Sequence, residues 1–80
     1  MSPMTEEEIM TWIANVFEEP VENIKTSTES KDIAGWDSLG ILNLIAGLDE
    51  NFGISVSDEE IQELRKVADI LELFRRYGRL

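Results

Sequence analysis

The sequence predicts an all-α fold, a four-helix bundle of three longer helices and one short helix, with a long first loop. Two observations favour this class. Apolar residues recur every three or four positions in three stretches, as they do on one face of a helix. Capping and helix-ending residues bound these stretches. Because a chain of 80 residues has room for one core, we expect a single domain, residues 1–80.

The first helix is expected to begin after Thr5, which forms a capping-box pattern with Glu8. Its apolar face falls at helical spacing and consists of Ile9, Trp12, Ile13, Val16 and Phe17. The helix ends at the segment Glu18-Glu19-Pro20, because a proline pushes the residue before it out of the helical region.

Residues 20–36 form a long connection, which we expect to be held to the core by Val21, Ile24 and Ile33. A loop of this length is uncommon in a compact domain unless it is functional or pinned. This one crosses the bundle and leads directly into Asp37 and Ser38.

The second helix is predicted from Ser38 to Phe52, with Asp37 as its N-cap and Gly53 as a left-handed C-cap. Leu39 begins its apolar face. That face consists of Leu39, Leu42, Ile45 or Ala46, Leu48 and Phe52, and is widened by Ile41 and Leu44. We place Ile41 on an exposed side of this helix, outside the core.

Two more helices complete the bundle. Ile54 and Val56 are expected to enter the core as extended chain, and Ser57 then caps a short helix from Asp58 to about Glu63, with Glu60 completing a capping box. The apolar face of the last helix consists of Val67, Ile70, Leu71, Phe74 and Tyr77. Its last turn holds Arg75 and Arg76, which suit the helix dipole, and Gly78 ends it.

Composition excludes several kinds of function. The chain has no cysteine and no histidine, so a disulfide, a zinc-thiolate site or hydrolytic and redox chemistry of its own is not expected. We predict no catalytic residue and no metal site. The net charge of −10 disfavours nucleic acid and suits basic patches on partner proteins. An acidic start and the lack of a long apolar run predict a cytoplasmic chain without a membrane span.

Ser38 is the candidate functional residue. As the first residue of a capped helix, its hydroxyl lies beside free N–H groups and the positive end of the dipole, where a phosphate is favoured. The motif Asp37-Ser38-Leu39 resembles the signature of the acyl and peptidyl carrier proteins, and the Phe52-Gly53 pair lies at the distance typical of that family. The order of helices resembles the family over nearly the whole chain.

This resemblance implies that Ser38, flanked by Asp37 and Leu39, carries 4′-phosphopantetheine, whose thiol holds acyl intermediates as thioesters. Implied partners are a phosphopantetheinyl transferase, acyl-activating or acyl-transfer enzymes and condensing enzymes of fatty-acid, lipid or polyketide-type biosynthesis. The carrier would be a freestanding monomer. By family analogy, the acyl chain would be lined by Leu42, Ala46 and Ile61, while partner recognition would involve Trp36, Ile41, Asp49, Glu50 and Glu60.

The sequence departs from the housekeeping carriers in one respect. Those carriers tend to be acidic just after Ser-Leu, where this chain has Gly40 and Asn43. Trp36, before the motif, is more usual in specialised carriers, and we expect it mainly to pack against the bundle end. We therefore predict a specialised carrier whose partner docks through apolar contact at Ile41.

Three other interpretations stay open. The cargo could be an aminoacyl or peptidyl group. Alternatively, residues 49–60 place oxygen donors at the first, third, ninth and twelfth positions of a twelve-residue loop between two helices, as in an EF-hand. The sixth position, however, is Ile54 where an EF-hand needs glycine. The third interpretation is a helical adaptor without a prosthetic group.

Overall fold

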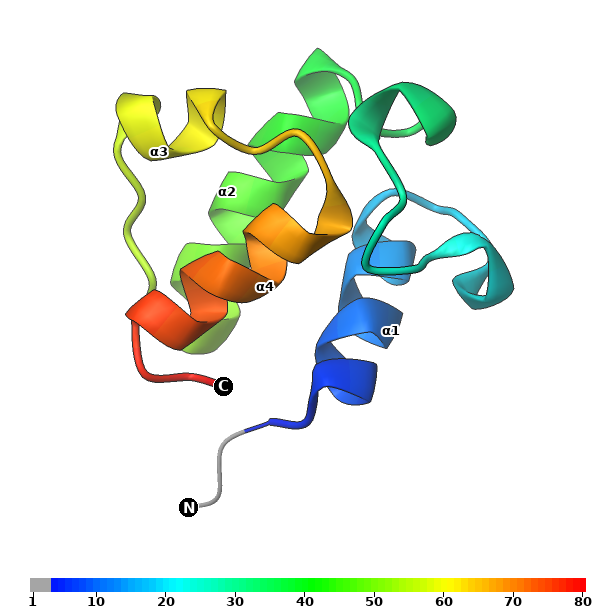
Figure 1. Cartoon of the computed structure of the whole chain (residues 1–80). Coiled ribbons are helices and arrows are strands. Elements are labelled where there is room, and N and C mark those ends of the chain that lie inside the picture. The colour runs from blue at the N-terminus through cyan, green and yellow to red at the C-terminus, as the bar shows by residue number, and fades with distance from the viewer. Residues whose placement is uncertain (1–3) are drawn as a thin grey trace.

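The computed structural model describes residues 4–80. Over these residues it contains four α-helices: α1 (Glu6–Val16), α2 (Ser38–Phe52), α3 (Asp58–Gln62) and α4 (Val67–Arg76). In Figure 1, α2 and α4 occupy the middle of the bundle, with α3 on one side and the loop after α1 on the other. The predicted fold class, three longer helices and one short helix, is therefore confirmed.

The predicted capping box begins α1. The Thr5 hydroxyl accepts a hydrogen bond from the Glu8 backbone N–H, and the Glu8 carboxylate accepts one from the Thr5 backbone N–H. The helix ends at Val16, earlier than Pro20 alone would require, because Glu18 adopts a left-handed φ of 54°. Backbone N–H groups of Glu18 and Glu19 then satisfy carbonyls of the last turn, as in a Schellman motif.

The long first loop is more ordered than the sequence suggests. It contains two 3₁₀ turns, Val21–Asn23 and Ser30–Asp32. Ile24 and Ile33 are buried as predicted, but Val21 is exposed, so its predicted role as an anchor is wrong. Backbone hydrogen bonds tie the loop to the segment between α3 and α4, from Ser30 N to Arg65 O and from Val67 N to Thr28 O.

The helix α2 has the predicted bounds and caps, with Gly53 at a left-handed φ of 65°. Its buried face differs from the predicted one. The buried residues are Gly40, Leu44 and Leu48, whereas Leu39 and Leu42 are 67% and 62% exposed. The sequence of α2 is apolar almost all round, so its pattern could not decide which face turns inward.

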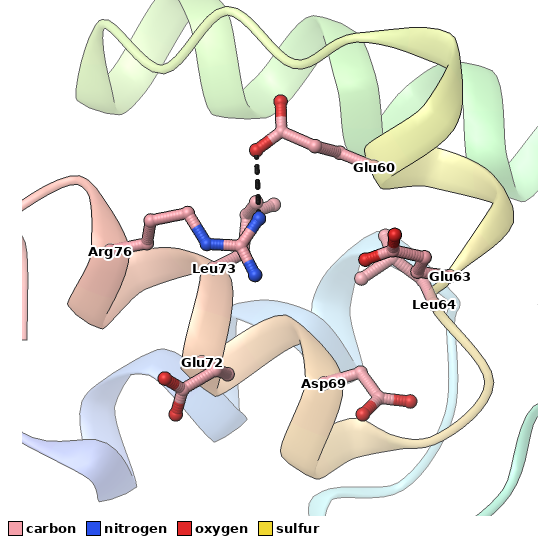
Figure 2. A pocket seen from close by; sticks show the side chains of 7 residues that line it. All are labelled: Glu60, Glu63, Leu64, Asp69, Glu72, Leu73 and Arg76. Atoms are coloured by element: carbon pink, nitrogen blue, oxygen red, sulfur yellow. Dashed lines mark hydrogen bonds and ion pairs between the residues drawn. The ribbon is translucent and has the colours of Figure 1, made fainter.

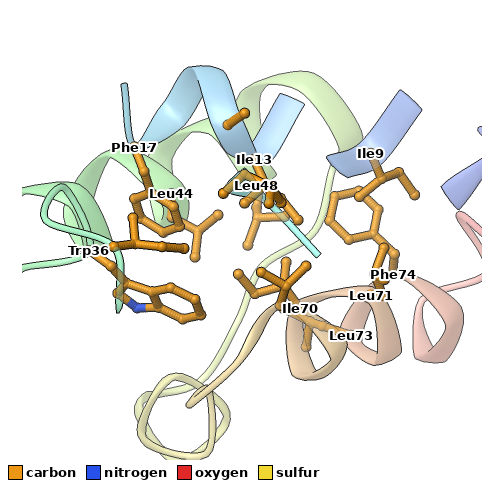
Figure 3. Packing of buried hydrophobic residues seen from close by; sticks show 14 of the residues in the cluster. Ile9, Ile13, Phe17, Trp36, Leu44, Leu48, Ile70, Leu71, Leu73 and Phe74 are labelled. Carbon is orange, nitrogen blue, oxygen red and sulfur yellow. The ribbon is translucent and has the colours of Figure 1, made fainter. Parts of the chain in front are cut away.

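Two aromatic groups lie in the core, at different places along the bundle. Phe17 stacks on Trp36, with ring centroids 4.9 Å apart and planes at 14°. Trp12, Phe52 and Phe74 form a second group of edge-on contacts. Figure 3 shows Phe17, Trp36 and Leu44 together, away from the neighbouring pair Ile9 and Phe74.

No helix within residues 4–80 combines the length and the apolar character needed to cross a membrane.

The helix α3 contributes no buried side chain, although Ile54 before it is buried as predicted. Gly78, at a φ of 73°, ends the last helix as predicted.

Candidate functional site

Ser38 is the first residue of α2 and is exposed. Asp37 before it has extended backbone angles, and its Oδ1 accepts a hydrogen bond of 2.9 Å from the Gly40 backbone N–H. The predicted N-cap is therefore present. A helix leaves its first N–H groups without partners inside the helix, and Asp37 satisfies only one of them. The serine hydroxyl thus lies at the positive end of α2 with open access from solvent.

The surface next to Ser38 is apolar. Leu39 and Leu42 are exposed and one helical turn apart, and Ala46 lies a further turn along the same side. Two sequence-based expectations are therefore wrong. Leu39 does not anchor the helix to the core, and Leu42 and Ala46 do not line an interior site for an acyl chain. Ile61, the third predicted lining residue, is half-buried on α3.

Ile41 is also misplaced by the sequence analysis. It is half-buried and packs against the buried core, because the face of α2 that turns inward is centred on Gly40, Leu44 and Leu48. A charged substitution at Ile41 would therefore disturb the fold as well as any partner contact. Its proposed role as an exposed docking residue loses its structural basis.

The structure gives packing reasons for the residues found at positions 40 and 36, on either side of Ser38. A side chain on Gly40 would overlap the carbonyl oxygen of Gly35, so this position cannot carry the acidic residue that housekeeping carriers tend to have. Trp36 is only 8% exposed, which confirms its predicted packing role and leaves little of its ring for a partner. Asn43 is exposed, so a charge is missing there without a packing reason.

The carboxylates predicted for recognition, those of Asp49, Glu50 and Glu60, belong to two helices, α2 and α3. Asp49 and Glu50 are exposed on α2, with Asp49 close to the Ser55 hydroxyl at 3.4 Å. Among residues 4–80, no group of three or more acidic side chains is arranged to hold a metal ion. The calcium-loop interpretation of residues 49–60 therefore has no coordination geometry to support it.

Glu60 instead joins α3 to α4. Its carboxylate completes the capping box with Ser57, accepts from the Tyr77 hydroxyl at 3.0 Å and pairs with Arg76 at 3.1 Å. The hydrogen bond from the Ser57 backbone is the main cause that lowers the pKa of Glu60. The hydrogen bond that the Tyr77 hydroxyl donates to Glu60 is the main cause that raises the pKa of Tyr77.

A hollow of about 120 Å³ lies beside this contact, between α3 and α4. Figure 2 shows Glu60 and Arg76 joined across it. Its lining is mostly charged: Glu60, Glu63, Leu64, Asp69, Glu72, Leu73 and Arg76. It does not include the three residues predicted to line an acyl chain, and its charge does not suit one.

Sequence reasoning missed the contribution of Phe17 to the site. Phe17 lies far from Ser38 in the chain, yet it contacts Gly35 and Trp36, the residues just before the Asp37-Ser38-Leu39 motif. A glycine in the first turn of a helix was the available signal, since such a residue usually has a packing reason.

A family model described as "Phosphopantetheine attachment site" matches residues 7–74. The chain therefore belongs to this family, a family of carriers, and the resemblance to acyl carrier proteins is confirmed. An acyl carrier protein of Phytoplasma mali (strain AT) is 34% identical over 71 residues, which cover 89% of this chain and 84% of that protein.

Other relatives agree. An acyl carrier protein of Acidothermus cellulolyticus is 26% identical over 73 residues, 86% of this chain and 87% of the relative. The solution structure of a holo acyl carrier protein from Geobacter metallireducens superposes with a TM-score of 0.76 at 29% identity. The superposition covers 90% of this chain and 83% of the Geobacter protein.

Proposed function

We propose that this chain is an acyl carrier protein in which Ser38 is the attachment site of 4′-phosphopantetheine. The observation that carries the proposal is an exposed serine at the capped N-terminus of α2, within a chain of the phosphopantetheine-attachment family. The residues fit the group: Ser38 supplies a hydroxyl, and the N-terminus of α2 favours the negative charge of a phosphodiester. Asp37 and Leu39 flank the attachment point.

The chain needs no catalytic residue of its own for this attachment. The Ser38 Oγ bonds to the pantetheine-bearing phosphorus of coenzyme A, the pyrophosphate bond breaks, and adenosine 3′,5′-bisphosphate leaves while a transferase accepts the hydroxyl proton. The prosthetic group, once bound, supplies a thiol that holds the cargo as a thioester. The proposed partners are this transferase and acyl-activating, acyl-transfer and condensing enzymes of a cytoplasmic pathway, which meet the carrier as a monomer.

Acyl cargo is favoured over aminoacyl or peptidyl cargo by the names of the relatives, which are acyl carrier proteins. The specialised character of the carrier rests on the surface beside Ser38. Leu39 and Leu42 present apolar side chains to solvent at the point where a partner must approach the serine. We therefore place apolar docking at Leu39 and Leu42 instead of Ile41.

Incubation with coenzyme A and a broad-specificity phosphopantetheinyl transferase tests the attachment. The parent should gain the mass of the prosthetic group, and peptide mapping should find it on Ser38. The Ser38→Ala variant should stay unmodified while its circular dichroism remains that of the parent. Ser27→Ala, an exposed serine in the long loop, is the matched control and should be modified at the parent rate.

The docking surface is tested by Leu42→Glu, which replaces an exposed apolar residue with a charge. It should slow acyl loading by the enzyme that loads the parent at least tenfold without loss of fold, and the parent rate should change little with salt. Asn43→Glu adds the same charge to the neighbouring exposed residue and should have a smaller effect. Equal loading rates of the parent and Leu42→Glu would contradict apolar docking.

A further inference from the structure

Three segments of the chain meet behind Ser38. They are the end of α1 at Phe17, the end of the long loop at Gly35 and Trp36, and the first turn of α2 at Gly40; we refer to these four residues as the Phe17 junction. A methyl group added to Gly35 would overlap the carbonyl oxygen of Phe17. A methyl group added to Gly40 would overlap the carbonyl oxygen of Gly35. The three backbones are therefore in direct contact.

Phe17 contacts both flanks of the serine. On one side its ring stacks on Trp36, two residues before Ser38, as Figure 3 shows. On the other side its Cδ1 lies 3.1 Å from the position that a Gly40 methyl group would take, two residues after Ser38. Ser38 itself is exposed, whereas Phe17 is only 2% exposed. The direction of the serine is thus set by neighbours that share one buried ring.

We propose that Phe17 is a positioning residue for the modification of Ser38, acting through Trp36 and Gly40. This inference rests on the proposed function of Ser38. Because the ring is buried in the carrier, it cannot touch the transferase, and any effect on the reaction passes through the geometry of the first turn of α2. A displacement of about 1 Å at a reacting group can reduce a rate by about 100-fold.

The core offers a matched control for Phe17. Phe74 is also buried, at 0% exposure, but belongs to the second aromatic group with Trp12 and Phe52. The substitutions Phe17→Leu and Phe74→Leu remove the same atoms from one core, one inside the Phe17 junction and one outside it. The difference in modification rate between the two variants therefore separates an effect on the position of Ser38 from the effect of a general loss of packing.

The measurement is steady-state phosphopantetheinylation with coenzyme A, below the unfolding temperature of each variant and corrected for the folded fraction. We expect Phe17→Leu to lower kcat by about tenfold with little change in the KM for coenzyme A, because an oriented nucleophile matters in the transition state. Phe74→Leu should remain within about twofold of the parent.

A second pair guards against a variant that does not fold. Gly40→Ala places a methyl group against backbone atoms in the junction, whereas Gly47→Ala, on the same helix, meets the ring of Trp12 at 2.7 Å. Gly40→Ala should slow modification and Gly47→Ala should not. The test uses whichever of the two junction variants, Phe17→Leu or Gly40→Ala, remains folded.

Equal values of kcat within each pair would overturn the positioning role while leaving the attachment at Ser38 intact. Failure of the parent to be modified at Ser38 would overturn both the proposed function and this inference. A lower kcat confined to the junction variants would support both.

Discussion

The Ser38 end of the bundle and the short helix α3 are held in opposite ways. At the Ser38 end, stacked rings, buried side chains and direct contact between backbones join α1, the long loop and α2. The helix α3 has no buried side chain and is tied to α4 by the carboxylate of Glu60. Apolar burial is strong and insensitive to pH, whereas a polar contact at the surface contributes little and responds to pH and salt.

The difference shows that the elements of this small domain are not held equally strongly. A chain of 80 residues buries too little surface to hold every element equally well. Stacked rings and direct backbone contact lie behind Ser38, the proposed attachment site. The helix α3, which lies on the side of α2 and α4 away from the long loop in Figure 1, has weaker contacts and is expected to open locally at lower cost.

The largest expected effect comes from removing the stacked ring. Trp36→Ala should lower the free energy of unfolding by about 3–5 kcal/mol, the usual range for loss of a buried aromatic side chain. Ile61→Ala, on α3, should cost only about 1–2 kcal/mol because the residue is half-buried. Urea unfolding of the two variants checks this ratio. Equal losses would mean that α3 is packed as firmly as the Ser38 end.

The two N-caps give a smaller and more specific contrast. Asp37→Ala and Ser57→Ala each remove a side-chain acceptor for a backbone N–H of the first turn, and each should cost about 0.5–2 kcal/mol. Only Asp37→Ala should also slow modification of Ser38. Modification of Asp37→Ala at the parent rate would show that Asp37 is a cap and nothing more.

The smallest effect concerns the pH dependence of α3. The pKa of Glu60 is lowered, first by the Ser57 backbone hydrogen bond, so the folded state favours the ionised carboxylate. Its contribution is fully present above the pKa of Glu60 in the unfolded chain and is lost as pH falls through the lowered pKa. Glu60→Gln should therefore flatten the acid side of the curve of thermal midpoint against pH.

Glu8 contributes a similar acid-side loss through its hydrogen bond with the Thr5 backbone, so a residual slope is expected in Glu60→Gln. Glu59→Gln, which removes an exposed charge from the same helix, is the control and should follow the parent curve. If Glu60→Gln and the parent show the same pH dependence, the folded state does not favour the ionised Glu60 carboxylate.

Local signals in the sequence predicted much of this structure. The caps at Thr5, Asp37 and Ser57 and the left-handed glycines at positions 53 and 78 depend on hydrogen bonds within a few residues, and all are found as predicted. Such contacts can be derived from spacing alone. The position of Ser38 at a capped helix start belongs to the same class.

What the sequence could not predict depends on contacts between distant segments. The buried face of α2 was misassigned because leucines and isoleucines occur all round it. Gly40, which closely approaches Gly35, lies on the face that turns inward, and Leu42 lies on the exposed side. The pairing of the long loop with residues 65–68 likewise left no periodic signal.

The most direct measurement is peptide mapping by mass spectrometry of the chain isolated from its native cell. We predict that the peptide containing Ser38 carries 4′-phosphopantetheine, free or loaded with an acyl thioester whose mass identifies the cargo. Recovery of the entire chain with Ser38 unmodified, or with the group on another residue, would contradict the central claim that Ser38 is the attachment site.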